Sequence, residues 1–167
     1  MKDAYIVSGF RSPVGKAKKG GLRFIRPDDL AAKVIKGLVK KTKGLEGEMV
    51  DDLIVGNAVP EAEQGMQMAR YISLLSLPKE VPGLIINRYC GSGLEAIHLA
   101  CAKINSGSAE CVIAGGTESM SMVPMTGYKS ALNYNISNTN PEYYLSLIHI
   151  SEPTRPRLIS YAVFCLK

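Results

Sequence analysis

The sequence has few of the residues that mark several large classes of protein. It contains no tryptophan, two histidines and four cysteines in 167 residues. No two cysteines form a Cys-Xaa-Xaa-Cys pair, which is the spacing typical of a structural zinc site. We therefore expect no bound metal, and we expect the four cysteines to be thiols and not disulfides.

Long apolar runs are also missing. No segment approaches the roughly 20 consecutive apolar residues that span a bilayer, and the first residues lack the apolar core of a secretory signal. These features predict a cytoplasmic protein with no membrane span. The 20 basic and 15 acidic residues are spread along the chain, so its net charge of +5 does not predict a nucleic-acid partner.

The chain does contain the material of a globular domain. Apolar residues make up 46% of it and charged residues 21%. Short apolar runs alternate with longer segments of helical periodicity, and several of the runs are continuously apolar, as in a parallel sheet covered by helices on both faces. The predicted order is β-α-β-α-β-α-β, with strands over 4–8, 52–56, 84–87 and 111–114, and helices over 28–43, 66–76 and 92–106.

Helix signals support this order. Pro27 and two following aspartates place acidic charge at the start of the first helix, where the helix dipole favours it. Gly107 follows the third helix as a stop signal. Apolar residues at three- and four-residue spacing predict a buried stripe on this third helix, formed by Leu94, Ile97, Cys101 and Ile104.

Cys90 lies between the third predicted strand and the third helix. In this position the free amides of the first helical turn and the positive end of the helix dipole favour a thiolate. Gly91 and Gly93 leave room for backbone strain in the turn and for the close approach of an acyl thioester. A free cysteine is more often a small buried hydrophobe, and Cys101 and Cys111 fit that alternative better than Cys90 does.

Residues 86–94, with the sequence Ile-Asn-Arg-Tyr-Cys-Gly-Ser-Gly-Leu, resemble the signature that surrounds the acyl-enzyme cysteine of thiolases (acetyl-CoA C-acyltransferases and 3-ketoacyl-CoA thiolases). Other motifs of the family are matched in the same order along the chain. The resemblance covers residues 4 to about 144, and the further matches are residues 11–16, 28–31, 56–57 and 114–121.

The resemblance implies the thiolase-like layered α-β-α-β-α fold, of which this chain holds the first β-α-β-α-β-α-β half-domain, incomplete. Residues 1–120 would form the amino-terminal α/β domain, and residues 121–144 would begin the loop domain that covers CoA. It also implies acyl transfer between CoA thioesters through an S-acyl intermediate on Cys90, whose backbone N–H donates to the oxyanion. The reaction is 3-ketoacyl-CoA thiolysis or acetyl-CoA condensation.

The same resemblance implies CoA and acyl-CoA as substrates, no other cofactor, and a homo-oligomer, dimeric or tetrameric, for the full-length parent. The activating histidine, the second cysteine in a Cys-Xaa-Gly-Gly motif and the Asn-Glu or His-Glu motif of the family are not found here. His98 lies eight residues after Cys90 in the helix, where a packing or surface role is expected. We therefore expect this fragment to be inactive, and its sequence leaves the CoA-contacting residues and the acyl chain length undefined.

Residues 145–167 form a tail of different character. Segments 145–155 and 159–167 resemble the conceptual translation of a sequencing adapter, so we interpret the tail as foreign to the family. The alternative is a native strand, because residues 159–166 are apolar and rich in β-forming residues. His149 and Cys165 are set aside with the tail.

Two other functions stay open. A ketoacyl synthase-like condensing enzyme also carries a cysteine at a helix start, but it uses carrier-protein thioesters. A non-catalytic thiolase-like lipid carrier would keep the fold without turnover. The sequences of residues 90–93 and 116–120 favour a thiolase over the first, and the presence of Cys90 argues against the second.

Overall fold

The computed structural model describes residues 2–131, 133 and 163–166. Helices and strands alternate in the predicted order, and a fifth strand follows at the end of the chain. The predicted β-α-β-α-β-α-β order is confirmed. The elements are β1 (Ile6–Phe10), α1 (Pro27–Lys41), β2 (Asp52–Gly56), α2 (Met68–Ser76), β3 (Gly83–Ile86), α3 (Ser92–Ser106), β4 (Val112–Gly116) and β5 (Val163–Leu166), with short 3-10 turns η1 (Gly47–Met49) and η2 (Ala62–Gln64).

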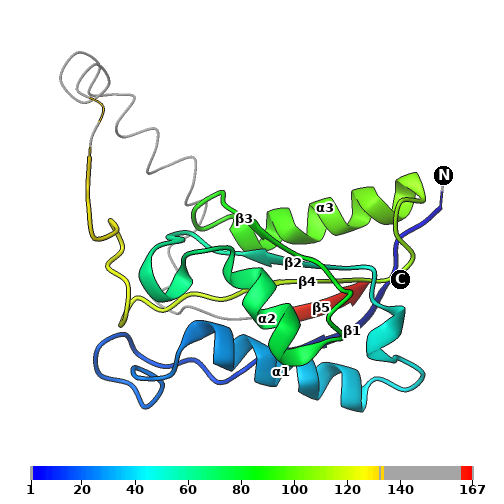
Figure 1. The fold of residues 1–167 in the computed structure, drawn as a ribbon, viewed down its shortest axis with the longest axis horizontal. Coiled ribbons are helices and arrows are strands. Elements are labelled where there is room, and N and C mark those ends of the chain that lie inside the picture. Colours follow the sequence, from blue (N-terminus) through cyan, green and yellow to red (C-terminus); the bar gives the residue numbers. More distant parts are fainter. Residues whose placement is uncertain (1, 132, 134–162, 167) are drawn as a thin grey trace.

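The strands form one sheet in the order β1-β5-β4-β2-β3. Strand β2 pairs in parallel with both β3 and β4, so the carboxyl ends of these three strands lie at the same edge. Helix α3 covers one face of the sheet, and α1 and α2 cover the other (Figure 1). The layered α/β fold class is therefore confirmed.

Strand β2 is buried on both faces because its side chains alternate between two cores. Leu53 and Val55 belong to the core with α1 and α2, whereas Ile54 belongs to the core with α3. All five residues of the strand are buried. This explains why an uninterrupted apolar run marks the strand in the sequence.

The predicted signals at the helix ends are confirmed. Helix α1 begins at Pro27, with two aspartates in its first turn. Asp28 is buried and accepts from Arg26 at 2.8 Å, which fixes the entry of the chain into the helix. Gly107 ends α3 in the left-handed conformation, with φ of 77°.

The prediction of a buried stripe on α3 is wrong for Leu94 and only partly correct for Ile97 and Cys101. Leu94 is 65% exposed, and Ile97 and Cys101 are only partly buried against the core. The fully buried positions carry small side chains, apart from one isoleucine, so the helix lies closer to the sheet than a leucine stripe would allow. The buried residues of α3 are Ser92, Ala96, Ala100 and Ile104.

Strand β5 falls within the tail that the sequence analysis had set aside. It lies between β1 and β4 and is antiparallel to both. We predicted four strands from the sequence, and the structure adds this fifth one because an apolar segment is available to fill the place between β1 and β4. The rest of the tail, residues 145–162 and 167, lies outside the described residues, so its interpretation as foreign sequence stays a prediction.

Candidate functional site

Cys90 lies in the short connection between β3 and α3. Strand β3 ends at Ile86 and α3 begins at Ser92, so Cys90 immediately precedes the helix N-cap residue Gly91. Cys90 is exposed. The structure therefore places it where the sequence predicted, at the carboxyl edge of the sheet and next to the amino end of a long helix.

Hydrogen bonds hold the turn before Cys90. Tyr89 has a left-handed backbone conformation, with φ of 46°, which is strained for an aromatic residue. Its N–H donates to Asn87 Oδ1 at 2.8 Å. The hydroxyl of Ser92 accepts from the N–H of Arg88 at 2.8 Å and donates to the carbonyl of Tyr89 at 2.5 Å, so both sides of the strained residue are fixed.

The expected backbone strain does not fall on Gly91, whereas the expected room for an acyl thioester at Gly91 and Gly93 stays a prediction. Gly91 has φ of −84°, which any residue adopts, and the left-handed residue is Tyr89 instead. The positions that sterically require glycine are instead at the ends of β2 and β4, which face the amino end of α3. A Cβ atom at Gly56 would overlap the backbone of Ser92, and one at Gly116 would lie 3.1 Å from the carbonyl oxygen of Gly56. Glycines at the ends of β2 and β4 therefore let the amino end of α3 approach the sheet edge.

A charged pair flanks the turn on its exposed side. The guanidinium of Arg88 donates to the carboxylate of Glu95 in the first turn of α3. The side chain of Arg88 is 69% exposed, so its contribution to stability is small. The pair places one positive and one negative group near Cys90.

A polar network, for which the motifs of the sequence predict no role, joins residues that follow β2 and β4. Asn57 is buried, and its Nδ2 donates to the carbonyl of Thr117 at 2.8 Å. Gln64 is fully buried; its Nε2 donates to Glu118 Oε1, and its Oε1 accepts from the N–H of Ser119. Glu118 Oε2 accepts from the N–H of Ala58 at 2.6 Å.

The sequence contains a pattern that indicates this network, namely polar residues directly after two strands. Asn57 directly follows β2, and Thr117 and Glu118 directly follow β4. Because β2 and β4 are parallel neighbours, residues that follow their carboxyl ends meet at one edge. Polar residues after two adjacent strands therefore indicated a network there.

Burial raises the pKa of Glu118 above its ordinary value of 4.5. The hydrogen bonds from Ala58 and Gln64 favour the carboxylate and oppose this shift, but burial outweighs them. Glu118 is thus the ionisable residue of this network whose protonation state depends on the packing around it.

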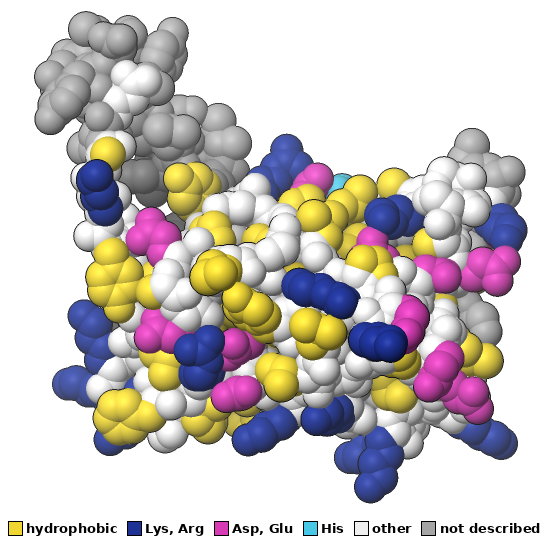
Figure 2. Space-filling view, viewed as in Figure 1, with side chains coloured by type: hydrophobic (Ala, Val, Ile, Leu, Met, Phe, Trp, Pro, Cys, Tyr) yellow, Lys and Arg dark blue, Asp and Glu magenta, His cyan; other side chains and the backbone are white. Residues whose placement is uncertain are grey.

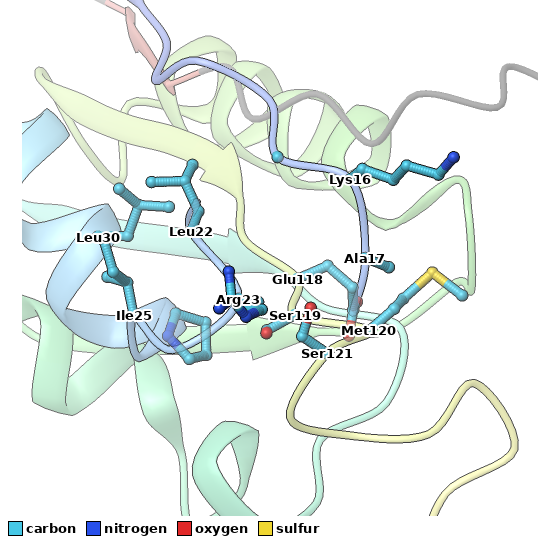
Figure 3. A pocket seen from close by; sticks show the side chains of 12 residues that line it. Lys16, Ala17, Leu22, Arg23, Ile25, Leu30, Glu118, Ser119, Met120 and Ser121 are labelled. Carbon is cyan, nitrogen blue, oxygen red and sulfur yellow. The ribbon is translucent and has the colours of Figure 1, made fainter. Parts of the chain in front are cut away.

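A small cavity borders Glu118 on the side of the loop between β1 and α1. Figure 3 shows the side chains that line it, among them Leu22 and Ile25 from that loop and Glu118 and Ser119 from the segment after β4. The two loops are joined by the N–H of Lys18, which donates to Ser121 Oγ at 2.9 Å. The cavity has a volume of about 40 Å³, which is room for water but not for a CoA molecule.

The other titratable candidates do not join this site. Cys111 is buried at the start of β4, where its N–H donates to Asp51 Oδ2 at 3.0 Å. Cys101 is partly buried on α3, and His98 is exposed on the same helix. Packing roles for these cysteines agree with the sequence analysis. Within the part of the chain that the structure describes, no three His, Cys, Asp or Glu residues are grouped as metal ligands.

The family profile described as "Thiolase, N-terminal domain" matches residues 4–146. The chain is 53% identical to the 3-ketoacyl-CoA thiolase of Bacillus subtilis (strain 168) over 153 residues, which are 91% of this chain and 39% of that protein. It is 42% identical to the 3-oxoadipyl-CoA/3-oxo-5,6-dehydrosuberyl-CoA thiolase of Escherichia coli (strain K12) over 132 residues, covering 78% of this chain and 33% of that protein.

A solved structure, the acetyl-CoA acetyltransferase of Bacillus anthracis, is similar to the chain with a TM-score of 0.68 and 34% sequence identity. The similarity covers 80% of this chain and 32% of that one. The chain thus spans between about a third and two fifths of the length of these relatives. Profile, sequence relatives and structure agree on the region that contains Cys90.

Proposed function

This chain belongs to the thiolase family, and we propose that it is the cysteine-bearing amino-terminal part of an acyltransferase acting on CoA thioesters. In this proposal Cys90 is the nucleophile that carries the acyl group. The observation that supports it is the position of an exposed cysteine beside the amino end of α3, on a turn whose backbone is fixed by hydrogen bonds.

The proposed first step is attack by the Cys90 thiolate on the carbonyl carbon of an acyl group. A bond forms between Cys90 Sγ and this carbon, and the bond to the leaving group breaks. In thiolysis the leaving group is the two-carbon unit of a 3-ketoacyl-CoA, which departs as acetyl-CoA after taking up a proton. The thiol of a second CoA then takes the acyl group and regenerates the cysteine.

In the condensing direction, acetyl-CoA acylates Cys90 and CoA leaves as the thiol. A carbanion from a second acetyl-CoA then attacks the acyl carbon and releases the cysteine. In both directions the backbone N–H of Cys90 is the proposed donor to the oxyanion. Proton transfer needs groups that this sequence does not supply, so we propose that the chain as given does not turn over.

Partners and location are part of the proposal. The substrates are CoA and acyl-CoA, as the names of the relatives indicate for those proteins, and no further cofactor is proposed. A cytoplasmic location is part of the proposal, supported by the described cysteines Cys90, Cys101 and Cys111, none of which is in a disulfide. Among the helices of the described residues, none has the length and apolarity to cross a membrane.

The domain limits and assembly of the parent are further elements of the proposal. Residues 1–120 supply the α/β domain, whose sheet β5 completes, and residues 121–144 are proposed to begin a segment that covers CoA. A homo-oligomer is supported by apolar residues exposed on α2, where Tyr71, Leu74 and Leu75 are 38%, 51% and 44% exposed. Hydrophobic side chains lie among interspersed basic and acidic ones on the face that includes this helix (Figure 2).

The reactivity of Cys90 tests this function. The folded chain is treated with a limiting amount of iodoacetamide at neutral pH, and modification of each cysteine is quantified by peptide mass spectrometry. The reference is Cys90 of the same chain in urea. Folding can only reduce access to the thiol, so faster reaction of Cys90 in the folded chain than in urea reports stabilisation of its thiolate. Buried Cys111 should react more slowly folded than unfolded.

A second arm uses the substrate class itself. Incubation with acetyl-CoA should place an acetyl group on Cys90 and not on Cys101 of the same molecules. If Cys90 reacts no faster folded than unfolded and takes no acetyl group, the acyltransferase proposal fails and the non-catalytic carrier is favoured. Acylation from a carrier-protein thioester but not from acetyl-CoA would favour the ketoacyl synthase-like alternative.

A further inference from the structure

A continuous series of hydrogen bonds runs from the end of β4 to the turn that carries Cys90. Glu118 Oε2 accepts from the N–H of Ala58 at 2.6 Å. The carbonyl of Ala58 accepts from Asn87 Nδ2 at 3.0 Å. The series joins segments that are far apart in sequence, because residue 58 follows β2 and residue 118 follows β4.

Asn87 extends the series to the residue next to Cys90. Its Oδ1 accepts from the N–H of Tyr89 at 2.8 Å, so its carboxamide contacts the loop after β2 with one atom and the turn with the other. Asn87 and Tyr89 are both exposed, so burial does not fix this turn. The left-handed conformation of Tyr89 must therefore be held by hydrogen bonds.

The first member of the series is itself held firmly. Besides the N–H of Ala58, the Glu118 carboxylate accepts from fully buried Gln64 at 2.5 Å. Gln64 is fixed in turn, because its Nε2 also donates to the carbonyl of Val59 at 2.7 Å. The loop after β2 is thus fastened at Ala58 and at Val59.

We propose that Glu118 and Asn87 are positioning residues for Cys90. Glu118 fixes the peptide of Ala58, the carbonyl of Ala58 orients Asn87, and Asn87 holds Tyr89 in the conformation that places Cys90 at the amino end of α3. Neither residue touches the acyl group. This inference rests on the proposed function, in which Cys90 is the nucleophile.

The experiment compares alkylation of Cys90 in the full chain and in single variants, with iodoacetamide as the probe. Asn87→Ala removes both hydrogen bonds of the carboxamide, and Glu118→Ala removes the acceptor for Ala58. We expect each to slow alkylation of Cys90 roughly two- to fivefold, which is the range of the helix-dipole contribution to a nearby charge. Protection of Cys111 should not change.

Two further variants separate positioning from general loosening of the loops. Glu118→Gln keeps an oxygen that accepts from the N–H of Ala58 but turns its NH2 group toward Gln64 Nε2, so part of the Cys90 reactivity should return. Glu61→Ala is the matched control: Glu61 also accepts from a backbone N–H at 2.6 Å, but the donor is Tyr128, away from the series. It should leave the Cys90 rate unchanged.

The outcomes are distinct. Wild-type rates for Asn87→Ala and Glu118→Ala, with Cys111 still protected, would overturn the inference, as would equal slowing by Glu61→Ala. If Glu118→Ala unfolds the chain, the inference is tested by the Cys90 rate of Asn87→Ala, because Asn87 is exposed and its substitution should not unfold the chain. If wild-type Cys90 shows no acceleration over its unfolded reference and takes no acetyl group from acetyl-CoA, the proposed function has failed instead, before any variant is compared.

Discussion

Gly56 and Ser92 are in such close contact that a side chain at Gly56 would overlap the backbone of Ser92. Gly56 ends β2, and Ser92 begins α3, so this contact sets the distance between the sheet edge and the helix that follows Cys90. The position of the candidate nucleophile therefore depends on a residue 34 positions earlier in the sequence. This dependence is steric, so it can be tested by adding a single methyl group at Gly56.

We expect Gly56→Ala to destabilise the chain by about 1–3 kcal/mol, because backbone must move to accept the methyl group. The same substitution at Gly37, in α1, meets nothing within 4 Å and should stabilise by about 0.5–1 kcal/mol. Urea unfolding of both variants measures the two effects. Equal free energies of unfolding for both would contradict the close packing of α3 on β2.

Lys103 of α3 pairs with Asp52 of β2 at 2.6 Å. The Asp52 side chain is 8% exposed, and its Oδ1 has no hydrogen-bond partner, so loss of the amine leaves a largely buried carboxylate without its cation. Lys103→Met should cost about 1–2 kcal/mol, less than for a fully buried pair because Lys103 is 35% exposed. The exposed pair of Lys2 and Glu110 offers the control, since Lys2→Met should have no measurable effect in the same urea experiment.

The raised pKa of Glu118 predicts a pH dependence of stability. Between the ordinary value of 4.5 and the raised value, the folded chain binds more protons at this site than the unfolded chain does. Protonation of Glu118 thus favours folding, and this contribution is lost as pH rises through the raised pKa. Relative to Glu118→Gln, which does not titrate, the free energy of unfolding of the wild type should fall as pH increases above 4.5. A difference that is constant or increases with pH would show that burial does not dominate at Glu118.

Strand β5 is the contact between β1 and the rest of the sheet. Among the described strands, β1 pairs with β5 alone, in the register Ser8 with Cys165 and Phe10 with Val163. A chain that ends at Ala162 should therefore lose hydrogen-exchange protection of the amides in Ile6–Phe10. Protection in β2 should persist, because β2 pairs with β3 and β4. Full protection of β1 in the shortened chain would contradict the strand order.

The regular part of the fold could be predicted because local signals agree with it. Proline and acidic residues are favoured in the first turn of a helix, as at Pro27, and Gly107 ends a helix because glycine adopts positive φ without strain. The continuously apolar strand β2 could be recognised because both of its faces are covered. Leu94 could not be placed, since helical spacing alone does not say which of two adjacent faces meets the sheet.

The sequence by itself determined the order of elements as far as β4, the family resemblance and the place of Cys90 between a strand and a helix, because each depends on residues close together in the chain. The tertiary structure decided what surrounds Cys90. The contact of Gly56 with Ser92 and the hydrogen bonds from Glu118 through Ala58 to Asn87 join segments that are distant in sequence. Those contacts depend on strand order and on the separation of helix and sheet, which are set only when the whole core is packed.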